Sequence, residues 1–168
     1  MSDDASDFDP NHFRKVLGHF PTGVTIITGM AGDVPAGFTI GSFTSVSLDP
    51  PLVGFFPQKI SDTWAAMAPF GKFCVNVLGA HQGAACWRFA KKGVDDRFVD
   101  VSWHTGITGS PIIDGAIAWI DCDTEVIHEV GDHYFVVGRV LAMSHSEDDD
   151  PAPLLFYRGK LGGYSVHE

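Results

Sequence analysis

The pattern of apolar and polar residues along the chain predicts short strands with a few helices. Apolar residues recur at spacings of three and four behind Asp9 and Pro10, which predicts a helix capped by Asp9. Two further helices are expected, one that starts at Ser61 and one over residues 80–92, followed by a loop-rich stretch. Runs of β-branched residues bounded by Gly and Pro predict strands over residues 22–28, 36–40, 52–56, 73–78 and 154–157.

The second half of the chain carries a different, alternating pattern. Residues 116–130 alternate between apolar and acidic side chains, which predicts a long half-buried strand with Asp121 and the other acids on the solvent face. Gly131 and Asp132 provide a turn, and residues 133–143 form a second long β run. The two long strands are therefore expected to pair as a hairpin.

These elements favour a mainly β fold, namely an antiparallel β-barrel with a few peripheral helices, over a doubly wound parallel sheet. The length of 168 residues suits one domain. Residues 1–8 are acidic and are expected to form a disordered tail, which leaves residues 9–168 as the folded domain.

Charge and cysteine content exclude several classes of function. The net charge of −10 argues against binding to nucleic acid or to anionic membranes. The uncharged residues 16–32 are interrupted by Gly and Pro, so they do not form a spanning helix, and the acidic N-terminus does not resemble a signal peptide. Three widely spaced cysteines predict reduced thiols in a cytoplasmic protein.

Familiar catalytic and metal motifs are missing from the sequence. His128, Glu129 and His133 have the wrong spacing for a helical zinc site and cross a predicted turn, so no metal is expected. The chain also has no GxSxG elbow, no phosphate-binding P-loop and no GxGxxG dinucleotide motif. Any nucleotide must therefore bind by another arrangement.

Residues 37–51 are rich in hydroxyl-bearing and small side chains. Such a segment either offers hydroxyl and backbone donors to a planar polar ligand or forms a surface strand. Further on, Lys59 and Ser61 stand at a predicted helix start, where a phosphate cradle and an ordinary N-cap are equally good interpretations. Arg158, beside Tyr157, suits either an anionic ligand or a surface salt bridge.

Taken in order, several segments resemble the short-chain flavin reductase family, the reductase components of two-component flavin-dependent monooxygenases. The similarity extends from about Phe13 to Tyr164, with Gly41 as a departure because relatives often have a larger or polar residue there. The segments are TGVTIIT, GFTIGSFTSVSLDPP, PQKISDTW, FCVNVL, DRF, GDHYFVVGRV and FYRGKLGGY.

The resemblance implies a split β-barrel that binds FMN or FAD, usually as a homodimer with the flavin near the subunit interface. It further implies NADH or NADPH as the reductant and a separate oxygenase as the partner. The residues that it assigns to the flavin ring are Thr39, Ser42, Phe43, Thr44 and Ser45. Those that it assigns to the flavin phosphate are Lys59, Ser61 and Thr63, with Asn76, Arg97 and Phe98 completing the flavin pocket. Those that it assigns to the nicotinamide cofactor are His133, Tyr157, Arg158 and Gly159.

The function expected from this resemblance is NAD(P)H-dependent flavin reduction that supplies reduced flavin to a monooxygenase. Hydride transfer between the cofactors needs no acid or base from the protein, so no catalytic side chain is expected and His133 is interpreted as a positioning residue. The alternative is a non-enzymatic flavin- or haem-binding protein on the same barrel. The GDH and FYRG segments favour the enzyme, because a storage protein needs no nicotinamide-binding face.

Overall fold

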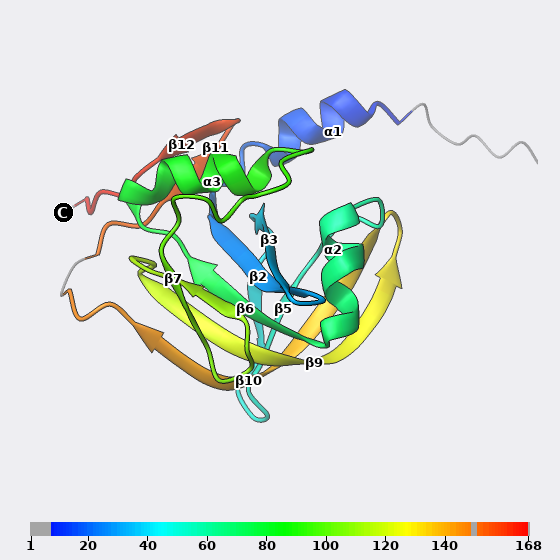
Figure 1. Ribbon diagram of the computed structural model, residues 1–168. Coiled ribbons are helices and arrows are strands. Elements are labelled where there is room, and N and C mark those ends of the chain that lie inside the picture. Colours follow the sequence, from blue (N-terminus) through cyan, green and yellow to red (C-terminus); the bar gives the residue numbers. More distant parts are fainter. Residues whose placement is uncertain (1–7, 149–150, 168) are drawn as a thin grey trace, which may run out of the picture.

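The computed structural model describes residues 8–148 and 151–167 (Figure 1). Most of the predicted tail, and part of the acidic loop near residue 149, lie outside these residues. The helices are α1 (Pro10–Leu17), α2 (Asp62–Met67) and α3 (Gly83–Ala90), with single 3-10 turns at Ala68–Phe70 and Ala80–Gln82. The strands are β1 (Thr22–Gly23), β2 (Thr25–Ala31), β3 (Val34–Ile40), β4 (Thr44–Ser47), β5 (Leu52–Phe55), β6 (Lys72–Val77), β7 (Trp103–Thr105), β8 (Pro111–Ile113), β9 (Ala118–Val130), β10 (His133–His145), β11 (Leu155–Tyr157) and β12 (Lys160–Gly162).

The main sheet is antiparallel and has seven strands in the order β3-β2-β6-β9-β10-β5-β4. Its two edge strands, β3 and β4, are consecutive in the chain and are joined by residues 41–43 alone. Because so short a link spans little distance, the sheet has to curl until its edges approach each other. The result is an antiparallel barrel that is open between β3 and β4, in agreement with the predicted mainly β fold.

The interior of this barrel is filled by aromatic and branched side chains. Phe55 packs edge-on against Trp64 and Phe73, with ring centroids 5.6 and 5.0 Å apart. Ile27, which is fully buried, belongs to the same cluster. Its neighbour Ile26 points to the opposite face of β2, as alternation along a strand requires, and packs in a second cluster with Phe89 of α3. The sheet is therefore buried on both faces where α3 covers it.

The helix α1 forms as predicted but packs little of its apolar face. The Asp9 carboxylate accepts a hydrogen bond from the backbone N–H of Asn11 at 2.9 Å, and Pro10 occupies the first turn. No residue of α1 is buried, and Phe20 just beyond it is 75% exposed. Figure 1 shows α1 at one end of the molecule, beside the β11–β12 hairpin and outside the barrel.

The β9–β10 hairpin is confirmed, but the prediction that its acidic residues face solvent is wrong for Asp121. This side chain is fully buried, and its two carboxylate oxygens accept bonds from the Thr108 hydroxyl at 2.6 Å and the Thr108 N–H at 3.0 Å. The cause lies in the segment expected to be a loop, which instead forms the β7–β8 hairpin and places Thr108 against β9. Two register shifts between β9 and β10 also interrupt the regular alternation of faces.

All three cysteines are free and buried, as expected for reduced thiols. Burial raises the pKa of the Cys122 thiol to about 12, and it also raises the pKa values of Cys74 and Cys86 above their ordinary range. These thiols are therefore protonated and act as small apolar core groups. Within the described ranges, none of the helices has the length and apolar character needed to span a bilayer.

Candidate functional site

A cleft of about 930 Å³ lies along β3, between this edge strand, the start of α2 and the segment that follows α3. Its size falls in the range of small-molecule and cofactor sites, roughly 300–1,000 Å³. Among the described strands β3 pairs with β2 only, so one row of its backbone N–H and C=O groups has no partner strand. The sequence-predicted residues that line the cleft are Thr39, Ser42, Ser61, Thr63, Arg97, Phe98 and His133.

On the β3 side, two predicted hydroxyls are held by the protein itself. Thr39 donates its hydroxyl to the carbonyl of Cys86 in α3 at 2.7 Å. The Ser42 Oγ accepts a bond from the Phe56 N–H at 3.1 Å. These bonds fix the edge strand and the connection to β4, so this wall of the cleft is rigid and its backbone groups are held in place.

At the start of α2, Ser61 is the N-cap, and its Oγ accepts a bond from the Trp64 N–H at 3.2 Å. The ordinary capping role, one of the two interpretations of this residue, is thus realised. Both Ser61 and Thr63 face the cleft, where Asp62 accompanies them. The carboxylate of Asp62 makes this rim less favourable to a phosphate than the sequence motif suggests.

Arg97 connects three elements around the cleft. Its Nη1 donates to the carbonyl of Gly37 in β3 at 2.8 Å and to the Thr63 Oγ1 at 2.7 Å, while its Nη2 donates to the carbonyl of Lys91 at 2.9 Å. Burial lowers the pKa of this guanidinium below its ordinary value, although an arginine stays charged. Arg97 therefore holds the segment after α3 against β3 and α2.

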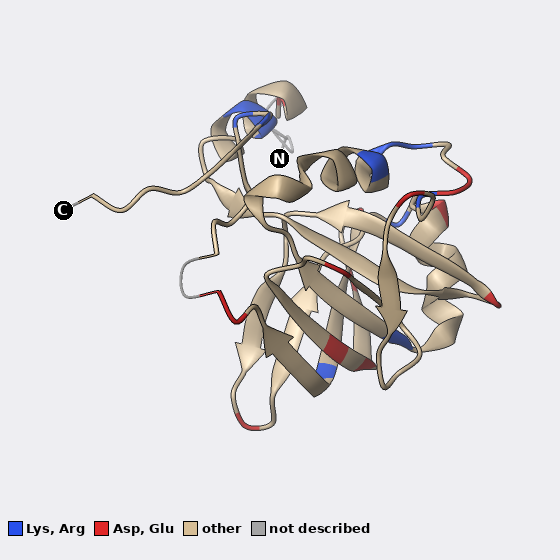
Figure 2. Ribbon diagram, turned by 60° about the vertical axis from the view of Figure 1, so that its left-hand side comes forward, with Lys and Arg blue, Asp and Glu red and all other residues tan. Residues whose placement is uncertain are grey.

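That segment carries charges of both signs at the rim of the cleft, and Figure 2 shows basic residues at the end of α3 followed by acidic ones in the loop. Lys92 and Asp95 line the cleft together with Phe98. The Phe98 ring packs edge-on against Phe89, with centroids 5.0 Å apart, and so anchors the segment to the α3 side.

His133 is the first residue of β10 and lines the cleft. Its Nδ1 lies 2.7 Å from an oxygen of the Asp132 carboxylate, and this bond holds the pKa of that carboxyl below its usual range. The backbone around it is tied to the neighbouring segment, since Lys59 N–H donates to the Asp132 carbonyl at 2.9 Å and Tyr134 N–H donates to the Pro57 carbonyl at 2.9 Å. The imidazole is therefore oriented by the Asp132 carboxylate, and the backbone that carries it is held against the neighbouring segment.

Several predicted flavin residues lie outside this cleft. Asn76 is fully buried, and its side chain donates to Ile26 O and Thr28 Oγ1 and accepts from Ile113 N–H at 2.8 Å, which gives it a structural role in the core. Lys59 pairs with Glu129 at 2.8 Å instead of facing the cleft. The remaining three are Phe43, which packs against the barrel core, and Thr44 and Ser45, which are exposed on β4.

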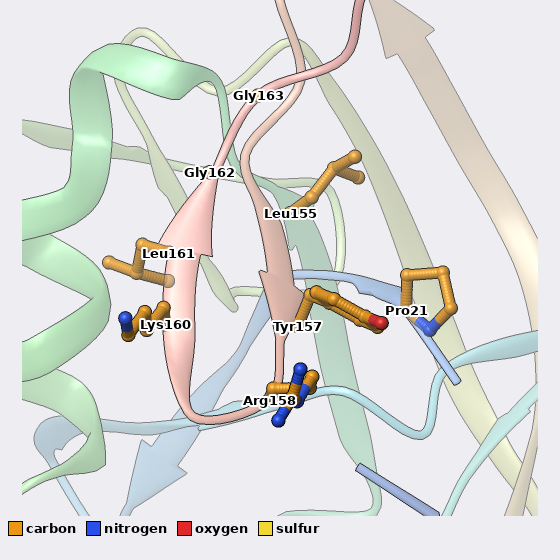
Figure 3. A pocket seen from close by; sticks show the side chains of 8 residues that line it. All are labelled: Pro21, Leu155, Tyr157, Arg158, Lys160, Leu161, Gly162 and Gly163. Carbon is orange, nitrogen blue, oxygen red and sulfur yellow. The ribbon is translucent and has the colours of Figure 1, made fainter. Parts of the chain in front are cut away.

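The predicted nicotinamide residues are divided between two places. His133 lines the cleft, whereas Tyr157 and Arg158 line a separate pocket of about 630 Å³ at the β11–β12 hairpin (Figure 3). Gly159 forms the turn of that hairpin with φ +78°. Among the described residues Arg158 has no ion-pair partner, so the salt-bridge interpretation of this residue is not realised.

Other residues that line the cleft, such as Phe56, Gln58 and Lys92, are not marked by any separate signal in the sequence. Phe56 stacks on Phe135 with centroids 4.6 Å apart, next to Ser42. Gln58 forms an isolated β-bridge with His133. These residues reach one surface only because segments far apart in the chain pair with each other. Gln58 alone of the three belongs to a segment quoted for the family resemblance, PQKISDTW.

The cleft combines flat apolar side chains with hydroxyls, a guanidinium, an imidazole and the unpaired edge of β3. This donor set fits a planar heteroaromatic cofactor with polar edges, so the barrel and its cleft define a cofactor-binding protein. The chain belongs to the family described as flavin reductase like domain, whose model matches residues 17–165.

Individual relatives extend this similarity over nearly the whole chain. A flavin reductase from Pseudomonas putida is 48% identical over 96% of this chain and 94% of its own length. The crystal structure of nitrilotriacetate monooxygenase component B from Mycobacterium thermoresistibile has a TM-score of 0.89 and 46% identity over 92% of this chain and 86% of that one. The NADH:FAD oxidoreductase SgcE6 of Streptomyces globisporus, in complex with NAD and FAD fragments, has a TM-score of 0.86 and 36% identity over 96% of this chain and 98% of that one.

Proposed function

We propose that this protein is an NAD(P)H:flavin oxidoreductase that reduces FMN or FAD and supplies the reduced flavin to a separate oxygenase component. The observation that carries the proposal is the cleft, which joins the β3 edge, the start of α2 and His133 in a chain of this family. The relatives described above include a flavin reductase and a monooxygenase component, which supports both halves of the proposal.

The protein's task in such a reaction is to bind and orient. Hydride transfer from a dihydronicotinamide to a flavin is chemistry that the two cofactors supply. The rigid wall of Thr39 and Ser42 would hold the flavin ring, with backbone groups of β3 directed at its polar edge. Ser61 and Thr63 remain candidates for the phosphate, with Lys59 available only if it leaves Glu129. An exposed ion pair of this kind is weak, about 0–1 kcal/mol.

The first test is steady-state NADH and NADPH oxidation with FMN and with FAD. Turnover with at least one pair of cofactors is expected, and its absence with every pair would contradict the proposal. A storage protein would instead bind flavin without oxidising the nicotinamide.

His133→Ala should raise the KM for the nicotinamide or lower kcat by about fivefold, because one oriented hydrogen-bonding side chain contributes about 1 kcal/mol. The flavin Kd should stay nearly unchanged. His128→Ala, on an exposed position of β9, is the matched control and should leave both parameters unchanged. Loss of flavin binding with unaltered nicotinamide kinetics would assign His133 to the flavin pocket instead.

A homodimer is the proposed assembly, because the apolar side chains of Phe13, Val16 and Leu17 in α1 are exposed, as is Phe20 just after it. Static light scattering should give about twice the 18.1 kDa chain mass, as a two-fold assembly requires. A monomer with full reductase activity would show that the interface is not needed for the site. The cytoplasmic location remains a prediction, supported by three free thiols.

A further inference from the structure

The lining of the cleft carries two basic side chains with permanent charge, and only one of them is free to meet a ligand. Of the lysines and arginines that the structure describes, Lys92 and Arg97 line the cleft. Both Nη atoms of Arg97 already donate to protein oxygens, at Gly37, Thr63 and Lys91. The Lys92 side chain is exposed and has neither an ion pair nor a hydrogen bond in the part of the chain that the structure describes.

Lys92 stands close to the start of α2, although it follows the end of α3 in the chain. The Arg97 guanidinium donates to the Lys91 carbonyl at 2.9 Å and to the Thr63 hydroxyl at 2.7 Å. Because both bonds start from one planar group, these two oxygens lie near each other. Lys92 follows Lys91 directly, and a lysine carries its charge on a flexible four-carbon stem. Its ammonium group can therefore reach the space beside Thr63, a candidate residue for the flavin phosphate.

Lys59, the lysine that the family resemblance assigns to the phosphate, is held elsewhere. Its ammonium group pairs with Glu129 at 2.8 Å and lies 5.7 Å from the centroid of the Tyr134 ring. Both partners belong to the β9–β10 hairpin, and Lys59 is not among the residues that line the cleft. Moving Lys59 to a phosphate in the cleft would break both contacts, whereas Lys92 has no contact to break.

The acidic residues of the cleft leave Lys92 available for an anion. Asp62 and Asp95 line the same cleft, yet neither forms an ion pair with Lys92. Both carboxylates are exposed, so water weakens their attraction for the ammonium group. A phosphate brings more negative charge and three acceptor oxygens, which makes it the stronger partner for this lysine.

We propose that Lys92, and not Lys59, is the lysine that binds the flavin phosphate in the cleft, an inference that rests on the proposed function. The ammonium group would donate charge-assisted hydrogen bonds to the phosphate oxygens beside Thr63. Lys91 provides a matched control, because it is the neighbouring residue and is equally charged and exposed but does not line the cleft.

Calorimetric titration with FMN and with riboflavin, which lacks the phosphate, tests the assignment. Lys92→Gln should weaken FMN binding about tenfold, because a charge-assisted contact is lost, and should leave riboflavin binding unchanged. Lys91→Gln removes the same amount of charge and should bind both flavins like wild type. Lys92→Arg keeps a phosphate-binding cation and should recover most of the FMN affinity. The difference between wild type and Lys92→Gln should shrink in about 1 M salt, where charges are screened within about 3 Å.

Three results would overturn the proposal. They are equal FMN affinity of Lys92→Gln and Lys91→Gln, equal weakening of FMN and riboflavin by Lys92→Gln, and a larger loss of FMN affinity for Lys59→Gln than for Lys92→Gln. Steady-state turnover by the wild-type protein separates this failure from that of the proposed function. Wild type that reduces FMN or FAD upholds the proposed function whatever the variants show. Wild type that neither binds nor reduces a flavin contradicts the proposed function, and the assignment of Lys92 fails with it.

Discussion

Replacing Ile27 with alanine should lower the free energy of unfolding by about 2–5 kcal/mol, the cost of a large apolar side chain removed from a filled core. Ile27 is fully buried in the barrel cluster with Phe55 and Phe73. The neighbouring rings are held by strand pairing and cannot collapse into the space, so the expected loss is at the upper end of this range. The midpoint of thermal unfolding, Tm, should fall by roughly 10 °C, because each kcal/mol lowers Tm by about 2–4 °C in a domain of this size.

Ile107→Ala is the matched control, since this isoleucine is 73% exposed in the loop between β7 and β8. It should change stability by less than about 0.5 kcal/mol, as is usual for surface substitutions. Denaturant unfolding with both variants measures the difference. Equal losses at the two positions would mean that the barrel interior does not dominate the stability of this fold.

Arg97→Ala should weaken flavin binding by about 100-fold, if the cleft holds the flavin as proposed. The substitution removes three hydrogen bonds from a charged donor, each worth about 1.5–3 kcal/mol. Only part of this lost free energy is expected to appear as weaker flavin binding. With no guanidinium between Gly37 and Thr63, the segment after α3 is free to move away from β3. Flavin fluorescence quenching gives the Kd.

Two further variants distinguish the positioning role of Arg97 from a simple need for positive charge. Arg97→Lys keeps the charge but lacks the planar fork, so it should remain nearly as defective as the alanine variant. Arg139→Ala, on β10, removes an arginine that pairs with Glu125 and lies outside the cleft, and it should bind flavin normally. Full rescue by lysine would show that charge alone is required at position 97.

Predictions from the sequence were most accurate for features that depend on neighbouring residues in the chain, such as a helix cap or a turn. Ser61 caps α2 as its position before a helix required, and Gly131 with Asp132 turns the chain into β10 so that His133 starts the strand. The buried partners of Asn76 could not be predicted, because an amide in a strand carries no mark of its surroundings and its partners Ile26 and Ile113 come from segments far away in the chain. The ion pair of Lys59 with Glu129 could not be predicted for the same reason, since Glu129 lies 70 positions further along the chain.

By itself the sequence determined the types of most elements, the β9–β10 hairpin and the helix caps, because each of these depends on residues close together along the chain. It also indicated the family, through the order of short motifs along the whole chain. It also indicated the edge segment near Ser42, through its density of small and hydroxyl-bearing residues. Only the tertiary structure decided which polar groups are buried, such as Asp121 beneath Thr108, and that His133 and Arg158 line two pockets. The physical reason is that backbone conformation follows from local sterics and periodicity, whereas burial and hydrogen-bond partners depend on how the curled sheet brings distant strands together.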